Sequence, residues 1–160
     1  MSDDRRAERL TTQMATLRAL SWSDRWTLAQ AAFAVMAIGL ILRVISLRRV
    51  HGMLRRLAPK ADRQRASAPS GAARPLEVAG LVSMASRHTP LANTCLHRSL
   101  ALWWMLRRRG FNSAVQFGAR KRDGRFEAHA WVEHEGIVIS EDAQVLDYIP
   151  MPWEPVEHDA

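Results

Sequence analysis

The helix signals around the chain's only cysteine, Cys95, constrain the fold more than any other feature. Asn93 and Thr94 precede it, and a short side-chain oxygen there accepts hydrogen bonds from the free N–H groups of a first helical turn. Apolar residues then recur at helical spacing, and three arginines lead into Gly110. The pattern predicts a helix of about four turns. Its positive end would lie at the thiol and favour the thiolate.

A predicted strand over residues 126–133 carries a histidine. Its residues alternate in character, so that His129 and Trp131 share one face. His129 could be a polar residue on a solvated face, but Trp131 beside it indicates a covered groove. We therefore treat His129 as a candidate general base.

A second strand would bring an acid towards that histidine. Glu135-Gly136 predicts a tight turn, and residues 137–140 predict the returning strand. Glu141 and Asp142 follow directly, where an acid can reach His129 on the partner strand. The chain thus offers a nucleophile, a base and an orienting acid in reachable places.

These motifs resemble the transglutaminase-like cysteine peptidases that remove the leader during lasso-peptide maturation. The resemblance rests on residues 95–102, 107–111, 128–133 and Gly136, and it extends more loosely over the apolar residues 24–57.

The resemblance implies a catalytic triad of Cys95, His129 and an acid. The family has that acid twelve residues after the histidine and usually as aspartate. Here this position holds Glu141, with Asp142 next to it. Position favours Glu141 as the third member, and Asp142 is the alternative.

The predicted elements add up to an α+β fold with a papain-like, transglutaminase-like core, in which the nucleophile helix packs on an antiparallel sheet. We expect a strand over residues 111–119, a hairpin loop over 120–125 with Asp123-Gly124 as its turn, and a short helix over 76–86. Residues 147–150 could cover the edge of the sheet.

Composition suggests where the domains divide. Residues 1–60 form a helical, basic and partly apolar N-terminal extension, residues 61–75 a linker rich in Ala, Ser, Pro and Gly, and residues 76–160 the peptidase domain. Residues 1–74 carry 14 Arg and Lys against 5 Asp and Glu, whereas residues 75–160 carry 9 against 11. No recognised nucleic-acid motif accompanies the basic charge, so nucleic acid is not an expected partner.

The N-terminal extension contains an apolar run at residues 31–42, inside a helix for which Ser23 is the expected cap. The run is shorter than the ~20 residues that cross a bilayer. We weigh three interpretations: packing on the catalytic domain or a partner protein, contact with a membrane surface through residues 24–57, and true membrane spanning. Packing is favoured, while the arginines after the run suit an anionic membrane surface.

Several kinds of site are not expected. One cysteine excludes an internal disulfide and fits a reducing compartment, so we expect a cytoplasmic protein, with membrane association as an option. The histidines lack metal-ligand spacing, no phosphate-binding glycine loop is present, and no cofactor is expected. Arg98 lies one turn after Cys95; it would bind either a buried structural acid, which we favour, or a substrate carboxylate.

The resemblance implies a substrate and partners. The substrate would be a ribosomally made precursor peptide, and the partners would be a separate leader-binding recognition-element protein and an ATP-dependent macrocyclase. Two alternatives stay open: a non-catalytic scaffold for the maturation complex, and transglutaminase-like acyl transfer to an amine.

Overall fold

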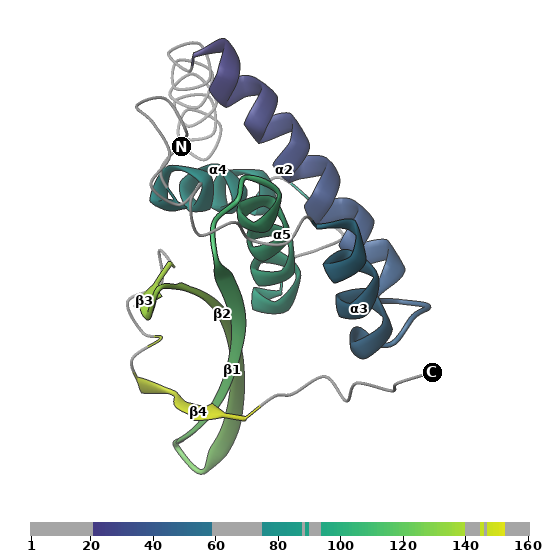
Figure 1. Ribbon diagram of the computed structural model, residues 1–160. Helices are drawn as coiled ribbons and strands as arrows, with labels where there is room; N and C mark the ends of the chain where they lie inside the picture. Colours follow the sequence, from purple (N-terminus) through teal and green to yellow (C-terminus); the bar gives the residue numbers. More distant parts are fainter. Residues whose placement is uncertain are drawn as a thin grey trace, which may run out of the picture.

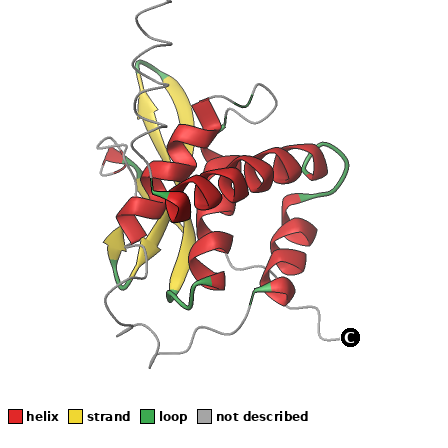
Figure 2. Ribbon diagram, turned by 90° about the horizontal axis from the view of Figure 1, so that it is seen from above, coloured by secondary structure: helices red, strands yellow, loops and turns green. Residues whose placement is uncertain are grey.

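The computed structural model places four helices on one side of a four-stranded antiparallel sheet (Figures 1 and 2). It describes residues 21–58, 75–87, 89, 94–139, 145 and 147–152. The elements are α2 (Trp22–Ile41), α3 (Leu47–Leu57), α4 (Pro75–Arg87), α5 (Cys95–Arg108), β1 (Ser113–Arg122), β2 (Arg125–His134), β3 (Ile137–Val138) and β4 (Ile149–Met151). The strand order is β3-β2-β1-β4. The predicted α+β fold is confirmed.

The cysteine helix α5 begins and ends as its sequence predicts. The Oγ1 of Thr94 accepts a hydrogen bond from the backbone N–H of His97 at 3.4 Å. At the other end Gly110 has a φ of 89°, and the Phe111 N–H donates to the Leu106 carbonyl at 3.0 Å. Most of the helix lies in the core, where its buried apolar side chains are Leu100, Ala101, Leu102, Trp103, Met105 and Leu106.

The apolar N-terminal helix α2 starts at a different cap from the expected one. Ser21, not Ser23, is the N-cap: its Oγ accepts from the Asp24 N–H at 3.1 Å and donates to the Asp24 carboxylate at 2.6 Å. The reciprocal pairing of a cap serine with an acid three residues on explains the earlier start.

One face of α2 packs on α4 and α5. Its buried residues join the same hydrophobic core as α5; they are Ala31, Ala34, Val35 and Ile38. Among the residues that the structure describes, no helix is both long enough and apolar enough to cross a membrane. The predicted linker lies almost wholly outside the described residues, so the domain division stays a prediction.

Two-residue turns set the register of the sheet. Asp123 and Gly124 have φ values of 50° and 79°, as a type I′ hairpin turn requires. The strands pair right up to Arg122 and Arg125. The expected loop over residues 120–125 was therefore too long, because only Asp123 and Gly124 lie outside the paired strands.

The turn after β2 agrees with the prediction. Glu135 and Gly136 have φ values of 51° and 78°. The returning strand predicted over residues 137–140 is observed as β3, and beyond it the Ile139 N–H donates to the Val132 carbonyl at 2.7 Å. Residue 140 lies outside the described residues.

The other side of β1 is covered by β4. Ile149 pairs with Ala119, and Met151 pairs with Phe117. The expectation that residues 147–150 cover the sheet edge is confirmed.

Gly118 on β1 is tightly packed and offers a test of how the sheet packs around His129. It lies opposite His129, and a Cβ added to it would stand 2.8 Å from the Trp131 ring and 2.9 Å from the Ile149 carbonyl oxygen. The rigid indole and the backbone carbonyl cannot move aside without disturbing their own packing. Gly118→Ala should therefore lower the free energy of unfolding by about 1–3 kcal/mol.

Gly52 is the matched control for that experiment. It lies within α3, and a Cβ there meets nothing within 4 Å. Gly52→Ala should therefore raise the free energy of unfolding by about 0.5–1 kcal/mol. Urea unfolding of both variants makes the comparison, and equal stability of the two would contradict it.

Candidate active site

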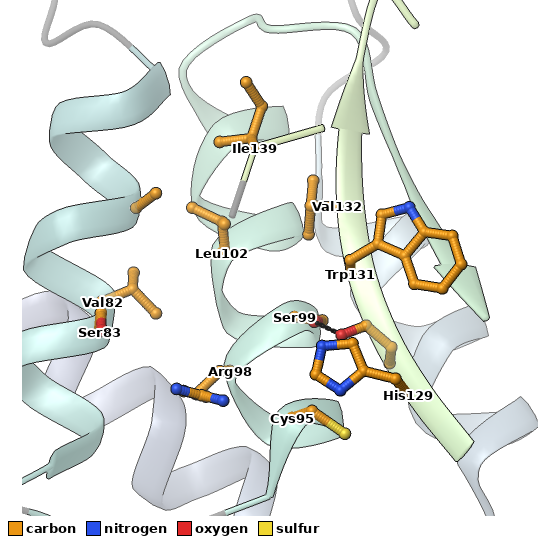
Figure 3. Close-up of a pocket in the computed structure, with 12 residues that line it drawn as sticks. Val82, Ser83, Cys95, Arg98, Ser99, Leu102, His129, Trp131, Val132 and Ile139 are labelled. Carbon is orange, nitrogen blue, oxygen red and sulfur yellow. Dashed lines mark hydrogen bonds between the residues drawn. The ribbon is translucent and has the colours of Figure 1, made fainter. Parts of the chain in front are cut away.

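A cavity lies where the start of α5 meets α4 and β2 (Figure 3). About 50 Å³ of it is open to water-sized molecules. It is lined by Ala79, Val82, Ser83, Cys95, Arg98, Ser99, Leu102, His129, Ala130, Trp131, Val132 and Ile139. The structure thus brings together Cys95 and His129, the two residues that the sequence singled out as nucleophile and base.

Cys95 is the first residue of α5 and carries a free, half-buried thiol. In Figure 3 the His129 imidazole lies next to it, at the end of the cavity where α5 begins. The helix cap also involves His97, whose Nδ1 lies 2.7 Å from the Thr94 Oγ1. Burial, with a smaller effect of Arg43, lowers the pKa of His97, which favours the neutral form of this ring at the helix start.

His129 is supported on one side by an aromatic ring. The imidazole stacks on Tyr148, with ring centroids 5.1 Å apart and an interplanar angle of 28°. The Tyr148 hydroxyl donates to the Glu127 carboxylate at 3.4 Å, and the Arg120 guanidinium lies 4.4 Å from the Tyr148 ring centroid. The ring that orients His129 is thus itself held by two charged side chains.

An ion pair anchors that support. The Arg120 Nε donates to the Glu127 carboxylate at 2.7 Å, and this hydrogen bond holds the pKa of Glu127 below its usual range. Sequence reasoning missed this group, because residues 120–125 were assigned to a loop. The Asp123-Gly124 turn did contain the signal: a two-residue turn at that place puts Arg120 opposite Glu127.

Trp131 closes the face of β2 that carries His129. It is 3% exposed, and its indole N–H donates to the Glu133 carboxylate at 2.9 Å. Gln116 donates to the other Glu133 oxygen at 3.3 Å. The predicted covered surface beside His129 is observed.

A buried hydrogen bond ties the cysteine helix to the histidine strand. The Ser99 Oγ, one turn after Cys95, donates to the Ala130 carbonyl at 2.8 Å, next in sequence to His129 (Figure 3). This bond fixes the two elements that bear the candidate nucleophile and base. Nothing in the sequence pattern predicted it, because it joins residues 31 positions apart.

Arg98 reaches the cavity from the same helix face as Cys95 (Figure 3). Within the described part of the chain, no carboxylate forms an ion pair with it. The structural acid favoured from the sequence is therefore not found among the described residues. The same part of the chain contains no cluster of three or more His, Cys, Asp or Glu residues that could hold a metal ion.

The two candidate acids, Glu141 and Asp142, lie outside the described residues. Ile139, two residues before Glu141, lines the cavity. The third member of the predicted triad stays a prediction.

Comparison with known proteins gives one match. A protein-family model described as the transglutaminase-like superfamily matches residues 38–152, which is more than two thirds of the chain. The matched region begins within α2 and contains the whole cavity. No curated protein and no solved structure matches the chain.

The Ser99 hydroxyl provides a test of how the site is held. Ser99→Ala leaves the Ala130 carbonyl buried without its donor, so the free energy of unfolding should fall by about 1–3 kcal/mol. Ser83→Ala is the matched control: Ser83 also lines the cavity, but its hydroxyl accepts a hydrogen bond from the exposed Arg87 side chain at 3.2 Å and holds no buried carbonyl among the described residues. The change should stay within about 0.5 kcal/mol. Denaturant unfolding distinguishes them; a loss no larger for Ser99→Ala would contradict a structural role for the bond.

Proposed function

Since the chain belongs to the transglutaminase-like superfamily, we propose that it is a cysteine peptidase that removes the leader from a ribosomally made lasso-peptide precursor. Membership of this superfamily implies thiol chemistry. The observation that carries the proposal is the single cavity lined by both Cys95 and His129. The substrate is supported by the resemblance of the cysteine, arginine and histidine motifs to the lasso-peptide leader peptidases.

In the first half of the reaction, His129 takes the thiol proton of Cys95, and the thiolate attacks the carbonyl carbon of the last leader residue. The backbone N–H of Cys95, at the start of α5, is suitably placed to donate to the developing oxyanion. The C–N bond then breaks, and the imidazolium gives its proton to the departing amine. The core peptide leaves with a free N-terminus, and the leader stays on Cys95 as a thioester.

In the second half, water replaces the amine. His129 takes a proton from water as it attacks the thioester, the C–S bond breaks, and the leader departs as a carboxylic acid. The stacked Tyr148 ring holds the imidazole plane through both steps. We assign the hydrogen bond to the second imidazole nitrogen to Glu141, with Asp142 as the alternative. The placement of Ile139 at the cavity supports an acid from the segment that follows it.

The proposal includes partners. In the lasso-peptide leader peptidases that these motifs resemble, a small domain that contains strands recognises the leader. The described N-terminal residues 21–58 form only the helices α2 and α3, and the buried faces of both belong to the core. We therefore propose that a separate leader-binding recognition-element protein presents the precursor, and that an ATP-dependent macrocyclase takes the released core peptide.

The first experiment is intact-mass analysis of the cognate precursor after incubation with the leader-binding partner and either wild type or Cys95→Ala. Only wild type should release a leader of defined mass, and Cys95→Ala should be slower by roughly 10⁴-fold or more, because the nucleophile is lost. Gly52→Ala, on α3 and outside the cavity lining, is the control and should cut at nearly the wild-type rate.

Three outcomes would change the assignment. Cutting by both proteins would mean that Cys95 is not the nucleophile. A product extended by an added amine, with no free leader acid, would favour acyl transfer. No cutting by either protein, together with retained binding of the macrocyclase, would favour the scaffold.

The choice of acid is tested by Glu141→Gln and Asp142→Asn. Loss of the orienting carboxylate leaves the imidazole in the wrong tautomer, so Glu141→Gln should lower kcat by up to roughly 10⁴-fold, and Asp142→Asn should have a much smaller effect. Single-turnover rates at saturating precursor give the comparison. The reverse order would assign the role to Asp142, and equal small losses would remove both acids from the triad.

A further inference from the structure

The helix α2 is apolar on two opposite faces, and the fold buries only one of them in the core. The outward face, which we call the outer face of α2, carries five large apolar side chains on one side of the helix, with the small exposed Ala29 between the second and the third. Its members and their exposed fractions are Trp22 (82%), Trp26 (65%), Phe33 (68%), Met36 (40%) and Leu40 (48%). The stripe continues beyond the helix at Val44, which is 87% exposed.

This surface is larger and more continuous than scattered exposed apolar residues. Two tryptophans and a phenylalanine in one stripe on a single helix are typical of an interaction site. Figure 1 shows α2 at the outside of the helical layer, separated from the sheet by α4 and α5. None of the residues that line the catalytic cavity belongs to α2. A partner on the outer face would therefore leave the cavity accessible.

The charge along α2 and α3 is mostly positive, since Asp24 in the first turn of α2 is the one acid in these two helices. Residues 25–58 contain six arginines and no Asp or Glu. All six arginines are exposed: Arg25 and Arg43 lie along or just after α2, and Arg48, Arg49, Arg55 and Arg56 lie on α3. This excess of positive charge favours an anionic partner.

Self-association fits these charges poorly. If two copies paired through the outer face in parallel, Arg25 would meet its own counterpart. In an antiparallel pair centred on Phe33, Arg43 would come near both Asp24 and Arg25 of the other copy, one opposite and one like charge. The parallel pair thus brings like charges together, and the antiparallel pair gains no net attraction from these charges.

An anionic lipid surface offers both an apolar layer for the outer face of α2 and negative charge for the arginines. Tryptophan and phenylalanine side chains enter the boundary between headgroups and acyl chains, and arginines contact lipid phosphates. A helix that lies in the plane of the interface does not need the length of a spanning helix. We propose that the outer face of α2, together with the arginines of α3, docks the protein onto an anionic membrane surface. This inference is independent of the proposed peptidase function.

The test is flotation of the full chain with two kinds of vesicle, one of phosphatidylcholine alone and one of equal parts phosphatidylcholine and phosphatidylserine. We expect partitioning at least about 10-fold stronger on the anionic vesicles, and a decrease as salt is raised. Trp26→Ser with Phe33→Ser should reduce partitioning at least about 10-fold, and so should Arg48→Glu with Arg49→Glu.

Phe126→Ser is the matched control. Phe126 is 82% exposed, as apolar as the α2 residues, but it lies on β2. Its substitution should leave partitioning unchanged. Thermal unfolding of every variant verifies the fold, which exposed substitutions should preserve.

A spectroscopic measurement separates contact from mere co-flotation. Anionic vesicles should shift the tryptophan emission of wild type to shorter wavelength, and Trp22→Phe with Trp26→Phe should abolish the shift while flotation persists. Three results would overturn the proposal: no flotation with either vesicle, equal flotation with both, or a vesicle-free dimer that Trp26→Ser dissociates. The last would identify the outer face as an interface between copies. Tight binding of a protein by the outer face, with no flotation, would equally exclude lipid as its partner.

Discussion

The burial of α5 on nearly every side is the constraint on which the rest of this structure depends. Its apolar residues contact α2 and α4 on one side and the sheet on the other. The helix therefore cannot rotate or slide without opening the core, so Cys95 at its first turn occupies a fixed position. Trp103 adds a second connection to the sheet, since its indole N–H donates to the Ser113 carbonyl at 3.0 Å. The thiol thus stands on a rigid element, as a reactive group requires.

The histidine is placed by a different kind of interaction. β2 has β1 as a neighbour along its whole length, but β3 pairs with only its last residues. Beside His129, the other edge of β2 is therefore available to α5, and Ser99 bonds its Ala130 carbonyl there. Tyr148, from the segment before β4, covers the imidazole. The site is assembled where helix, free strand edge and C-terminal segment meet.

Local signals in the sequence predicted the parts of this arrangement that are local in the chain. The Thr94 cap, the Gly110 terminus and the two glycine-containing turns each depend on a few neighbouring residues, and all are observed. Contacts between distant residues were not predictable in the same way. The bond from Ser99 to Ala130 and the stacking of Tyr148 on His129 depend on how complete elements pack, which no spacing encodes.

The apolar helix α2 illustrates that limit most clearly. A run with apolar residues on all sides shows no preferred face, so periodicity could not say which residues would be buried. The fold buries the face with the smaller side chains, which include Ala31, Ala34 and Gly39, because small residues let α2 approach α4 and α5 closely. The large aromatic side chains are left outside. Since exposure of such residues is unfavourable in water, their retention on one continuous stripe beside six arginines is better explained by an apolar, anionic contact surface than by the needs of the fold.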